Sequence, residues 1–290
     1  MTEALIKRQI DRKEPIAKMN KDLPLHERRV VYQIPGMDNV EVQRDLIYKR
    51  VEGTELKMDV YTPPGLPNDT RVPGVLFIHG GPIPSDFRPQ LKDWGQYVSY
   101  GELIAASGLV GVTFNHRYHD FTQLDQSASD IAAAIRYVRD HAELFHFDSD
   151  RLCLWAISGG GPFLSFALRD KPTFVRCIVA YYASLDLRQS KEASAVVSEE
   201  TLQKFSPVSY LSRSTSAGAP IFIARAGLDH PEFKQSIDLF LREALAANVV
   251  LDFANHHQGQ HAFDILDDAA RSRWIIARTI EFIKTYVQAD

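Results

Sequence analysis

The sequence has very little cysteine and no strong excess of charge of either sign. Only two of its 290 residues are cysteines, Cys153 and Cys177. Each lies inside an apolar run, so we expect buried thiols in strands, with a disulfide as the minor alternative. Lys and Arg number 33 against 37 Asp and Glu, whereas nucleic-acid binders usually carry a basic face. The composition therefore excludes a disulfide scaffold and gives no support to nucleic acid as a partner.

Long apolar segments and metal-binding motifs are also missing. The longest apolar stretch, residues 103–112, is interrupted by glycine and too short to cross a bilayer. The first 20 residues contain no apolar core of the length that a signal peptide needs. The ten histidines form no closely spaced set with cysteines or carboxylates. We therefore expect a cytoplasmic protein with no membrane partner, no metal and no organic cofactor.

From about residue 40 onward, short apolar runs alternate with helical patterns. Apolar residues at helical spacing predict helices around 131–138, 237–245 and 276–287, the first behind a Ser127-x-x-Asp130 capping signal. Strands that are apolar on both faces are typical of a parallel sheet covered by helices, so we predict a doubly wound α/β domain. The expected strands are 40–51, 56–61, 72–78, 109–114, 152–157, 175–183, 220–226 and 249–254.

Two segments lie outside this alternation. Residues 1–39 are charged and weakly periodic, and we interpret them as a helical or irregular N-terminal extension of a domain that occupies 40–290. Residues 187–218 are mostly polar and separate two expected strands. A loop of that length inside a compact domain usually has a function, so this segment is either a partial lid or a surface excursion.

A strand that runs into a glycine-rich turn contains the strongest local signal. The segment from Leu154 to Pro162 reads LWAISGGGP, with Ser158 at the junction. A serine between a strand and a helix sits on strained backbone that exposes its Oγ, and the turn requires small neighbours such as Ala156 and Gly160. The usual motif has glycine where this chain has Ala156. We interpret Ser158 as a nucleophile; the alternative is a glycine-rich turn with an incidental serine.

A second glycine-rich segment follows an earlier strand and reads His79-Gly80-Gly81-Pro82. Acyl transfer builds negative charge on a carbonyl oxygen, and hydrogen-bond donors must already point at that position. We expect the backbone amides of Gly80, Gly81 and Gly159 to supply these donors. His79 is expected to brace the loop by hydrogen bonds rather than to act as a base.

A base and an acid are expected near the C-terminal strands. His261 follows the last strand and Asp229 the strand before it, where side chains of parallel sheets meet ligands. Imidazole titrates near neutrality and can activate a hydroxyl, while a carboxylate holds its tautomer. Asp186 is the alternative acid, and His256 and His257 lie near the same strand end.

Other residues near these motifs have less direct interpretations. Asp264 is expected to support the histidine loop by capping a helix, and His116 and His119 to make packing or loop contacts. Several aromatic residues are expected either to line an apolar substrate pocket or to pack in the ordinary way. The members of this group are Phe87, Trp94, Tyr97, Tyr100, Tyr118 and Phe121.

Together these residues resemble the α/β-hydrolase superfamily, over residues 40–287. The similarity is to the serine esterase branch with the dienelactone-hydrolase-like and small acyl esterases, and to the catalytic domain of prolyl oligopeptidases. Dienelactone hydrolases use a cysteine where this chain has Ser158, and the oligopeptidases carry a propeller for which this chain has no room. Further supporting segments are LKMDVYTP at 56–63, SPVSYL at 206–211 and HAF at 261–263.

The resemblance implies a serine hydrolase that cleaves carboxylic esters of small or medium acyl groups through an acyl-enzyme intermediate. An amidase or aminopeptidase-like hydrolase of short peptides or aryl amides is the nearest alternative, because the same residues serve both reactions. A non-catalytic binding protein on the same fold is the third, since fold alone does not establish activity. The expected partner is a small-molecule ester or amide, and a homodimer is expected because symmetric dimers are common.

Overall fold

The computed structural model describes residues 22–211 and 218–288. Its centre is one eight-stranded sheet in the order β1-β2-β4-β3-β5-β6-β7-β8. β1 and β2 form an antiparallel hairpin, β2 is antiparallel to β4, and all other neighbours are parallel. The strands are β1 (Glu41–Val51), β2 (Thr54–Thr62), β3 (Val72–Ile78), β4 (Val110–Phe114), β5 (Phe147–Ile157), β6 (Val175–Tyr181), β7 (Ile221–Ala226) and β8 (Leu251–His256).

All eight predicted strands are confirmed, with shifted ends. β5 begins at Phe147 rather than at 152, and β6 ends at Tyr181 rather than at 183. Cys153 and Cys177 are register neighbours on β5 and β6. Both are buried free thiols, as expected.

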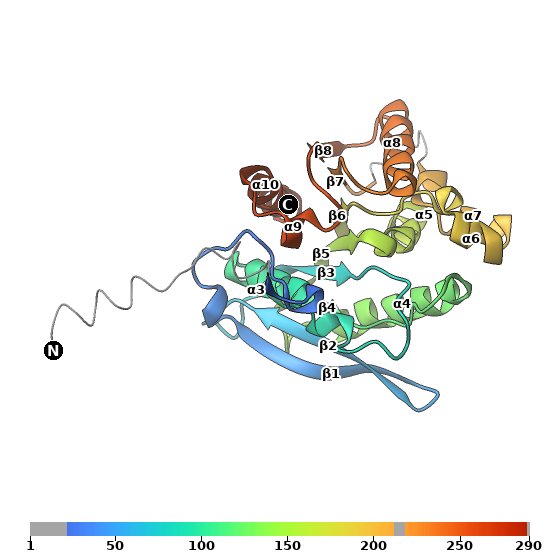
Figure 1. Cartoon of the computed structure of the whole chain (residues 1–290). Coiled ribbons are helices and arrows are strands. Elements are labelled where there is room, and N and C mark those ends of the chain that lie inside the picture. The colour runs from blue at the N-terminus through green and yellow to red at the C-terminus, as the bar shows by residue number, and fades with distance from the viewer. Residues whose placement is uncertain (1–21, 212–217, 289–290) are drawn as a thin grey trace.

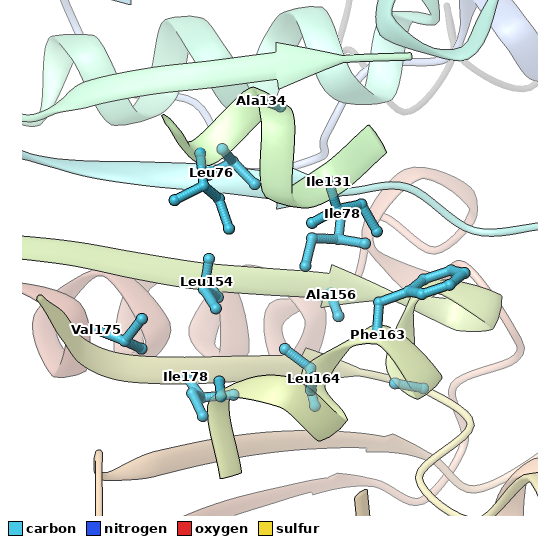
Figure 2. Close-up of a cluster of buried hydrophobic side chains, with 14 of the residues drawn as sticks. Leu76, Ile78, Ile131, Ala134, Leu154, Ala156, Phe163, Leu164, Val175 and Ile178 are labelled. Carbon is cyan, nitrogen blue, oxygen red and sulfur yellow. The ribbon is translucent and has the colours of Figure 1, made fainter. Parts of the chain in front are cut away.

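Helices cover both faces of the sheet (Figure 1). On one face pack α4 (Leu124–Asp140), α5 (Ser165–Asp170) and α8 (Pro231–Ala246), and on the other α3 (Gly95–Ala106) and α10 (Ala270–Val287). Leu76 and Ile78 of β3 point toward the first group, beside Ile131 and Ala134 of α4 (Figure 2). Val75 and Phe77, which alternate with these residues along β3, point toward the second group. This alternation explains the nearly continuous apolar character of the strands.

The predicted start of α4 is wrong. A 3-10 turn (Phe121–Gln123) precedes the helix, and the side chain of Asp120 accepts a hydrogen bond from the amide of Thr122. The helix therefore begins at Leu124 and places Ser127 and Asp130 inside it.

Asp130 instead anchors a buried ion pair. Its carboxylate accepts from Arg117 Nε at 2.8 Å and from Lys49 Nζ at 2.6 Å, and its side chain is fully buried. Arg117 lies in the loop that follows β4. The pair therefore ties that loop and β1 to helix α4.

The described part of the predicted N-terminal extension packs directly on the domain. Val30 and Val31 are buried, the amide of Val30 donates to Ser99 Oγ, and that of Val31 donates to the carbonyl of Asp264. A Cβ on Gly95 of α3 would lie 2.4 Å from the carbonyl oxygen of Glu27, so glycine is required there. Residues 22–39 thus contribute to the packing of α3, whereas residues 1–21 lie outside the described residues.

We predict that Asp130→Asn lowers the free energy of unfolding by about 3 kcal/mol, because it leaves Arg117 partly buried without its charged partner. Urea denaturation measures this. Asp125→Asn on the same helix is the control, since Asp125 pairs with Lys204 at the surface and should matter by less than about 1 kcal/mol. Equal losses in the two variants would contradict a special role for the buried pair.

Candidate active site

Ser158 sits on a tightly packed backbone turn at the end of β5. Its φ is +54°, in the left-handed region that non-glycine residues rarely adopt. A Cβ on Gly159 would lie 1.9 Å from the carbonyl oxygen of Gly81, and one on Gly161 would lie 2.2 Å from that of Ser184. The turn is therefore in backbone contact with the loops that follow β3 and β6, and these positions require glycine. A 3-10 helix (Ser158–Leu164) leads from the turn into α5.

Ser158, His261 and Asp229 form one chain of hydrogen bonds. Ser158 Oγ lies 2.8 Å from His261 Nε2, and His261 Nδ1 lies 2.9 Å from each carboxylate oxygen of Asp229. Asp229 follows β7 and is almost fully buried, while His261 follows β8 and is partly exposed. Since Nδ1 donates to the carboxylate, Nε2 is left to accept the hydroxyl proton of the serine.

The competing residues lie in other interactions. Asp186 accepts from Arg188 Nε at 2.7 Å and from Gln189 Nε2 at 3.0 Å. His256 is buried against Ser272 and Asp267, and His257 is exposed. Of the alternatives left open by the sequence, only Asp229 contacts the imidazole of His261 among the described residues.

The glycine loop after β3 offers fewer free donors than the sequence suggested. The amide of Gly80 donates to Tyr97 Oη at 3.2 Å, so it already has an acceptor. For the amide of Gly81 no acceptor occurs among the described residues. Gly159 is the second residue of its 3-10 helix, where amides lack an intrahelical partner. Two amides, those of Gly81 and Gly159, therefore flank the serine.

Two stacked histidines brace this loop from behind. The rings of His79 and His116 lie 3.7 Å apart between centroids. His79 Nδ1 donates to the carbonyl of Gly80 at 2.7 Å, and Nε2 accepts from the amide of His116 at 3.2 Å. These two hydrogen bonds require a neutral imidazole, because Nδ1 must carry a proton and Nε2 must not. Burial lowers the pKa of His79 to about 4. Burial, and second to it the electrostatic interaction with the neighbouring ring of His79, which disfavours protonation of both rings, holds the pKa of His116 well below its ordinary value.

Beside Ser158 lies a cavity of about 600 Å³. Tyr118 and Phe121, two of the aromatic residues that the sequence suggested, line it together with Phe233. The other lining residues are Gly81, Pro82, Gly159, Pro162, Ser184, Leu187, Gln189, Ser190, Lys191, Glu192, His230, Pro231, Glu232 and Gln235. Phe233 was missed because it lies in α8, where its spacing resembles that of an ordinary core residue.

Four of these aromatic residues do not line this cavity, and one of them, Tyr100 of α3, is buried with its hydroxyl bound to Asp264. Tyr97 is buried in α3 behind the glycine loop, where its hydroxyl is bound to the amide of Gly80. Phe87 and Trp94 pack against one another with ring centroids 5.5 Å apart. Trp94 also donates from Nε1 to the carbonyl of Pro89. For these residues the alternative of ordinary packing applies, because nearness in sequence to the glycine loop does not decide on which side of it a ring lies.

The polar segment 187–218 forms short helices in its described part, α6 (Lys191–Val196) and α7 (Glu199–Lys204). Its beginning, 187–192, contributes Leu187, Gln189, Ser190, Lys191 and Glu192 to the cavity wall. Residues 212–217 lie outside the described residues. The start of this segment therefore lies at the cavity, although it is far from Ser158 in the sequence.

Asp264 is not a helix cap, contrary to the prediction. It lies inside the short helix α9 (Phe263–Leu266) and is fully buried. Its carboxylate accepts from Gln96 Nε2, Tyr100 Oη and Tyr182 Oη, each at 2.8 Å. Burial raises the pKa of this carboxyl group, although the three donors oppose the shift.

The mixed sheet with a serine on a sharp turn after β5 defines an α/β-hydrolase fold. The chain belongs to the BD-FAE family, whose profile matches residues 58–241, and it is a carboxylic ester hydrolase. No curated protein sequence matches it. Among the described residues, no helix is long and apolar enough to cross a membrane, and no group of three His, Cys, Asp or Glu residues could hold a metal ion.

Several solved structures share the fold. The native esterase Est2 of the planctomycete Thermogutta terrifontis is 19% identical, with a TM-score of 0.67 over 87% of this chain and 94% of that one. The same esterase with bound butyrate is 18% identical, with a TM-score of 0.65 over 88% and 95%. Its form phosphorylated by paraoxon is 18% identical, with a TM-score of 0.64 over 88% and 94%.

We predict that stability falls as the pH is lowered from about 6.5 to about 4, because the unfolded histidine binds a proton that buried His79 excludes. The depressed pKa of His79 corresponds to a loss of about 3 kcal/mol over this range. Urea denaturation at several pH values measures it.

His79→Gln should reduce this pH dependence, while His257→Gln, at an exposed position, should leave it unchanged. A slope in His79→Gln equal to that of the wild type would show that His79 does not control the acid sensitivity.

Proposed function

We propose that this esterase hydrolyses esters of small acyl groups through an acyl-enzyme intermediate, with Ser158 as nucleophile, His261 as base and Asp229 as its orienting acid. The observation that carries the proposal is the unbroken chain of hydrogen bonds from Ser158 Oγ through the imidazole to a buried carboxylate. A hydroxyl becomes an effective nucleophile only when an adjacent base takes its proton.

In this mechanism Ser158 Oγ attacks the ester carbonyl carbon while its proton passes to His261 Nε2. Asp229 stabilises the imidazolium and keeps Nδ1 protonated. The amides of Gly81 and Gly159 donate to the developing oxyanion, and the amide of Gly80 supports the loop through Tyr97 instead. His261 then protonates the leaving alcohol as the C–O bond breaks. Water activated by the same imidazole attacks the acyl-enzyme and releases the acid and the free serine.

Small acyl groups are favoured by two observations. The cavity beside Ser158 combines aromatic walls at Tyr118, Phe121 and Phe233 with polar residues at Gln189, Lys191 and Glu192, so its apolar surface suits a short alkyl chain. The Thermogutta esterase of the same fold is described with bound butyrate and with bound propionate. Within the described residues, no contact favours an amide leaving group over an alcohol, so the amidase alternative gains no support.

The segment 187–192 is part of this proposal as one wall of the substrate cavity. Leu187 supplies an apolar surface, while Lys191 and Glu192 lie at exposed positions of the same wall. This arrangement supports a substrate whose acyl part contacts the apolar residues and whose remainder faces solvent.

We predict that Ser158→Ala lowers the rate of p-nitrophenyl acetate hydrolysis by at least about 10³-fold, because it removes the nucleophile. The wild type should also be labelled by a fluorophosphonate probe, and the variant should not. Ser184→Ala is the control, since Ser184 lines the same cavity but makes no hydrogen bond with His261 among the described residues. If the folded wild type neither hydrolyses the ester nor reacts with the probe, the proposed function is wrong.

We further predict that kcat/KM falls at least about tenfold between p-nitrophenyl butyrate and p-nitrophenyl decanoate, because methylenes beyond the aromatic walls would lie against the polar residues Gln189, Lys191 and Glu192 and displace their water. Steady-state rates over the acyl series measure this. A continuous rise of kcat/KM up to the decanoate would contradict the assignment to small acyl groups.

A further inference from the structure

Tyr182 has an unusual backbone conformation beside the candidate active site. It directly follows β6 and has a φ of +36°, which is rare for a bulky aromatic residue. Its amide donates to the carbonyl of Ala224 on β7 at 2.7 Å, and its side chain is buried. Strained residues persist only where the surroundings enforce them, and they cluster at functional sites.

The ring of Tyr182 packs edge-on against the imidazole of His261. The centroids lie 4.6 Å apart at an interplanar angle of 61°. Phe233 also contacts this imidazole, at 4.8 Å. The bond to Asp229 holds only Nδ1 and leaves the imidazole free to tilt about that contact. The two aromatic rings restrict this tilt, and with it the position of Nε2 relative to Ser158 Oγ.

The hydroxyl of Tyr182 is held as firmly as its ring. It donates to Asp264 Oδ1 at 2.8 Å and accepts from Gln96 Nε2 at 2.9 Å. Asp264 Oδ2 accepts from Gln96 Nε2 and Tyr100 Oη. These side chains come from α3, the end of β6 and α9, so three separate elements converge on one buried carboxylate.

The two contacts of Tyr182 reach the same short loop. Its ring meets His261, and its hydroxyl meets Asp264 in the helix that starts two residues after His261. Ala262 between them has a φ of +59°, so the loop turns sharply at this point. Tyr182 therefore sets the distance between the His261 imidazole and the buried carboxylate of Asp264, which anchors the loop that carries His261.

We propose that Tyr182 is a positioning residue for the reaction: its ring sets the orientation of the His261 imidazole, and its hydrogen bond to Asp264 sets the position of the loop that carries His261. This inference rests on the proposed function, because it concerns the same base. Tyr182 touches no reacting atom and acts only through His261.

Tyr182→Phe tests this inference by removing one oxygen and keeping the ring. With the anchor weakened, kcat should fall about tenfold with KM within about twofold of the wild type, because misplacement of a catalytic group slows the chemical step. Tyr181→Phe is the matched control. Tyr181 is equally buried and its hydroxyl is bound to Thr279 Oγ1 at 2.7 Å, but its ring contacts Phe263 and Tyr182 rather than His261. Both variants should lower the urea midpoint, and only Tyr182→Phe should lower kcat.

A readout without turnover separates this inference from the proposed function. The proton on His261 Nδ1 should give a downfield proton NMR signal, assigned by its loss in His261→Gln. We expect this signal to shift or broaden in Tyr182→Phe and to stay unchanged in Tyr181→Phe. A wild type that shows the signal but hydrolyses no ester would refute the proposed function alone. If Tyr182→Phe keeps both the wild-type kcat and the wild-type signal while losing stability, Tyr182 is a structural residue and the inference is overturned.

Discussion

The close approach of three backbone segments around Ser158 sets the geometry of the site. The turn after β5 touches the loop after β3 at Gly81 and the loop after β6 at Ser184, at distances that leave no room for a side chain. Because these contacts join backbone to backbone, a neighbouring side chain cannot relieve a clash by changing rotamer. The same packing that holds Ser158 at positive φ brings the amides of Gly81 and Gly159 beside it. The proposed nucleophile and the proposed oxyanion donors thus form one rigid unit.

Buried polar side chains support this unit. The hydrogen bonds of each side chain fit one protonation state of that side chain. His79 uses both ring nitrogens as a neutral imidazole, and its depressed pKa follows from burial. Asp264 gathers three donors within the core. An unmet buried polar group is costly, so such networks define one arrangement rather than several. The histidine network holds the glycine loop after β3, and the Asp264 network holds the loop of His261.

The cavity wall is less regular than this framework. Its aromatic residues come from the loop after β4 and from α8, and the segment 187–192 adds a polar margin. The proposed function assigns substrate preference to these wall residues and the chemistry to the rigid turn. This division is common in folds where loops at the carboxyl ends of parallel strands surround the site.

Much of the framework was predictable from local sequence. Strand positions followed from apolar runs, and the turn at Ser158 followed from its glycines, because strand periodicity and backbone sterics act between residues close in the chain. Local patterns also misled: the Ser127-x-x-Asp130 pattern predicted a cap, yet α4 begins at Leu124, directly after a 3-10 turn capped by Asp120, and Asp130 inside the helix pairs with Arg117.

Only the tertiary structure decided which groups meet. Asp229 and Asp186 both follow strands, and their separate partners distinguish them. Tyr97 turned out to lie behind the glycine loop rather than in the pocket, and Asp264 proved to be an anchor bonded to Gln96, 168 residues away in the chain. Sequence alone determined the strands and the turn, because short-range sterics specify them. The partners of the buried polar groups depend on contacts between distant segments, which form only when the sheet and its covering helices pack together.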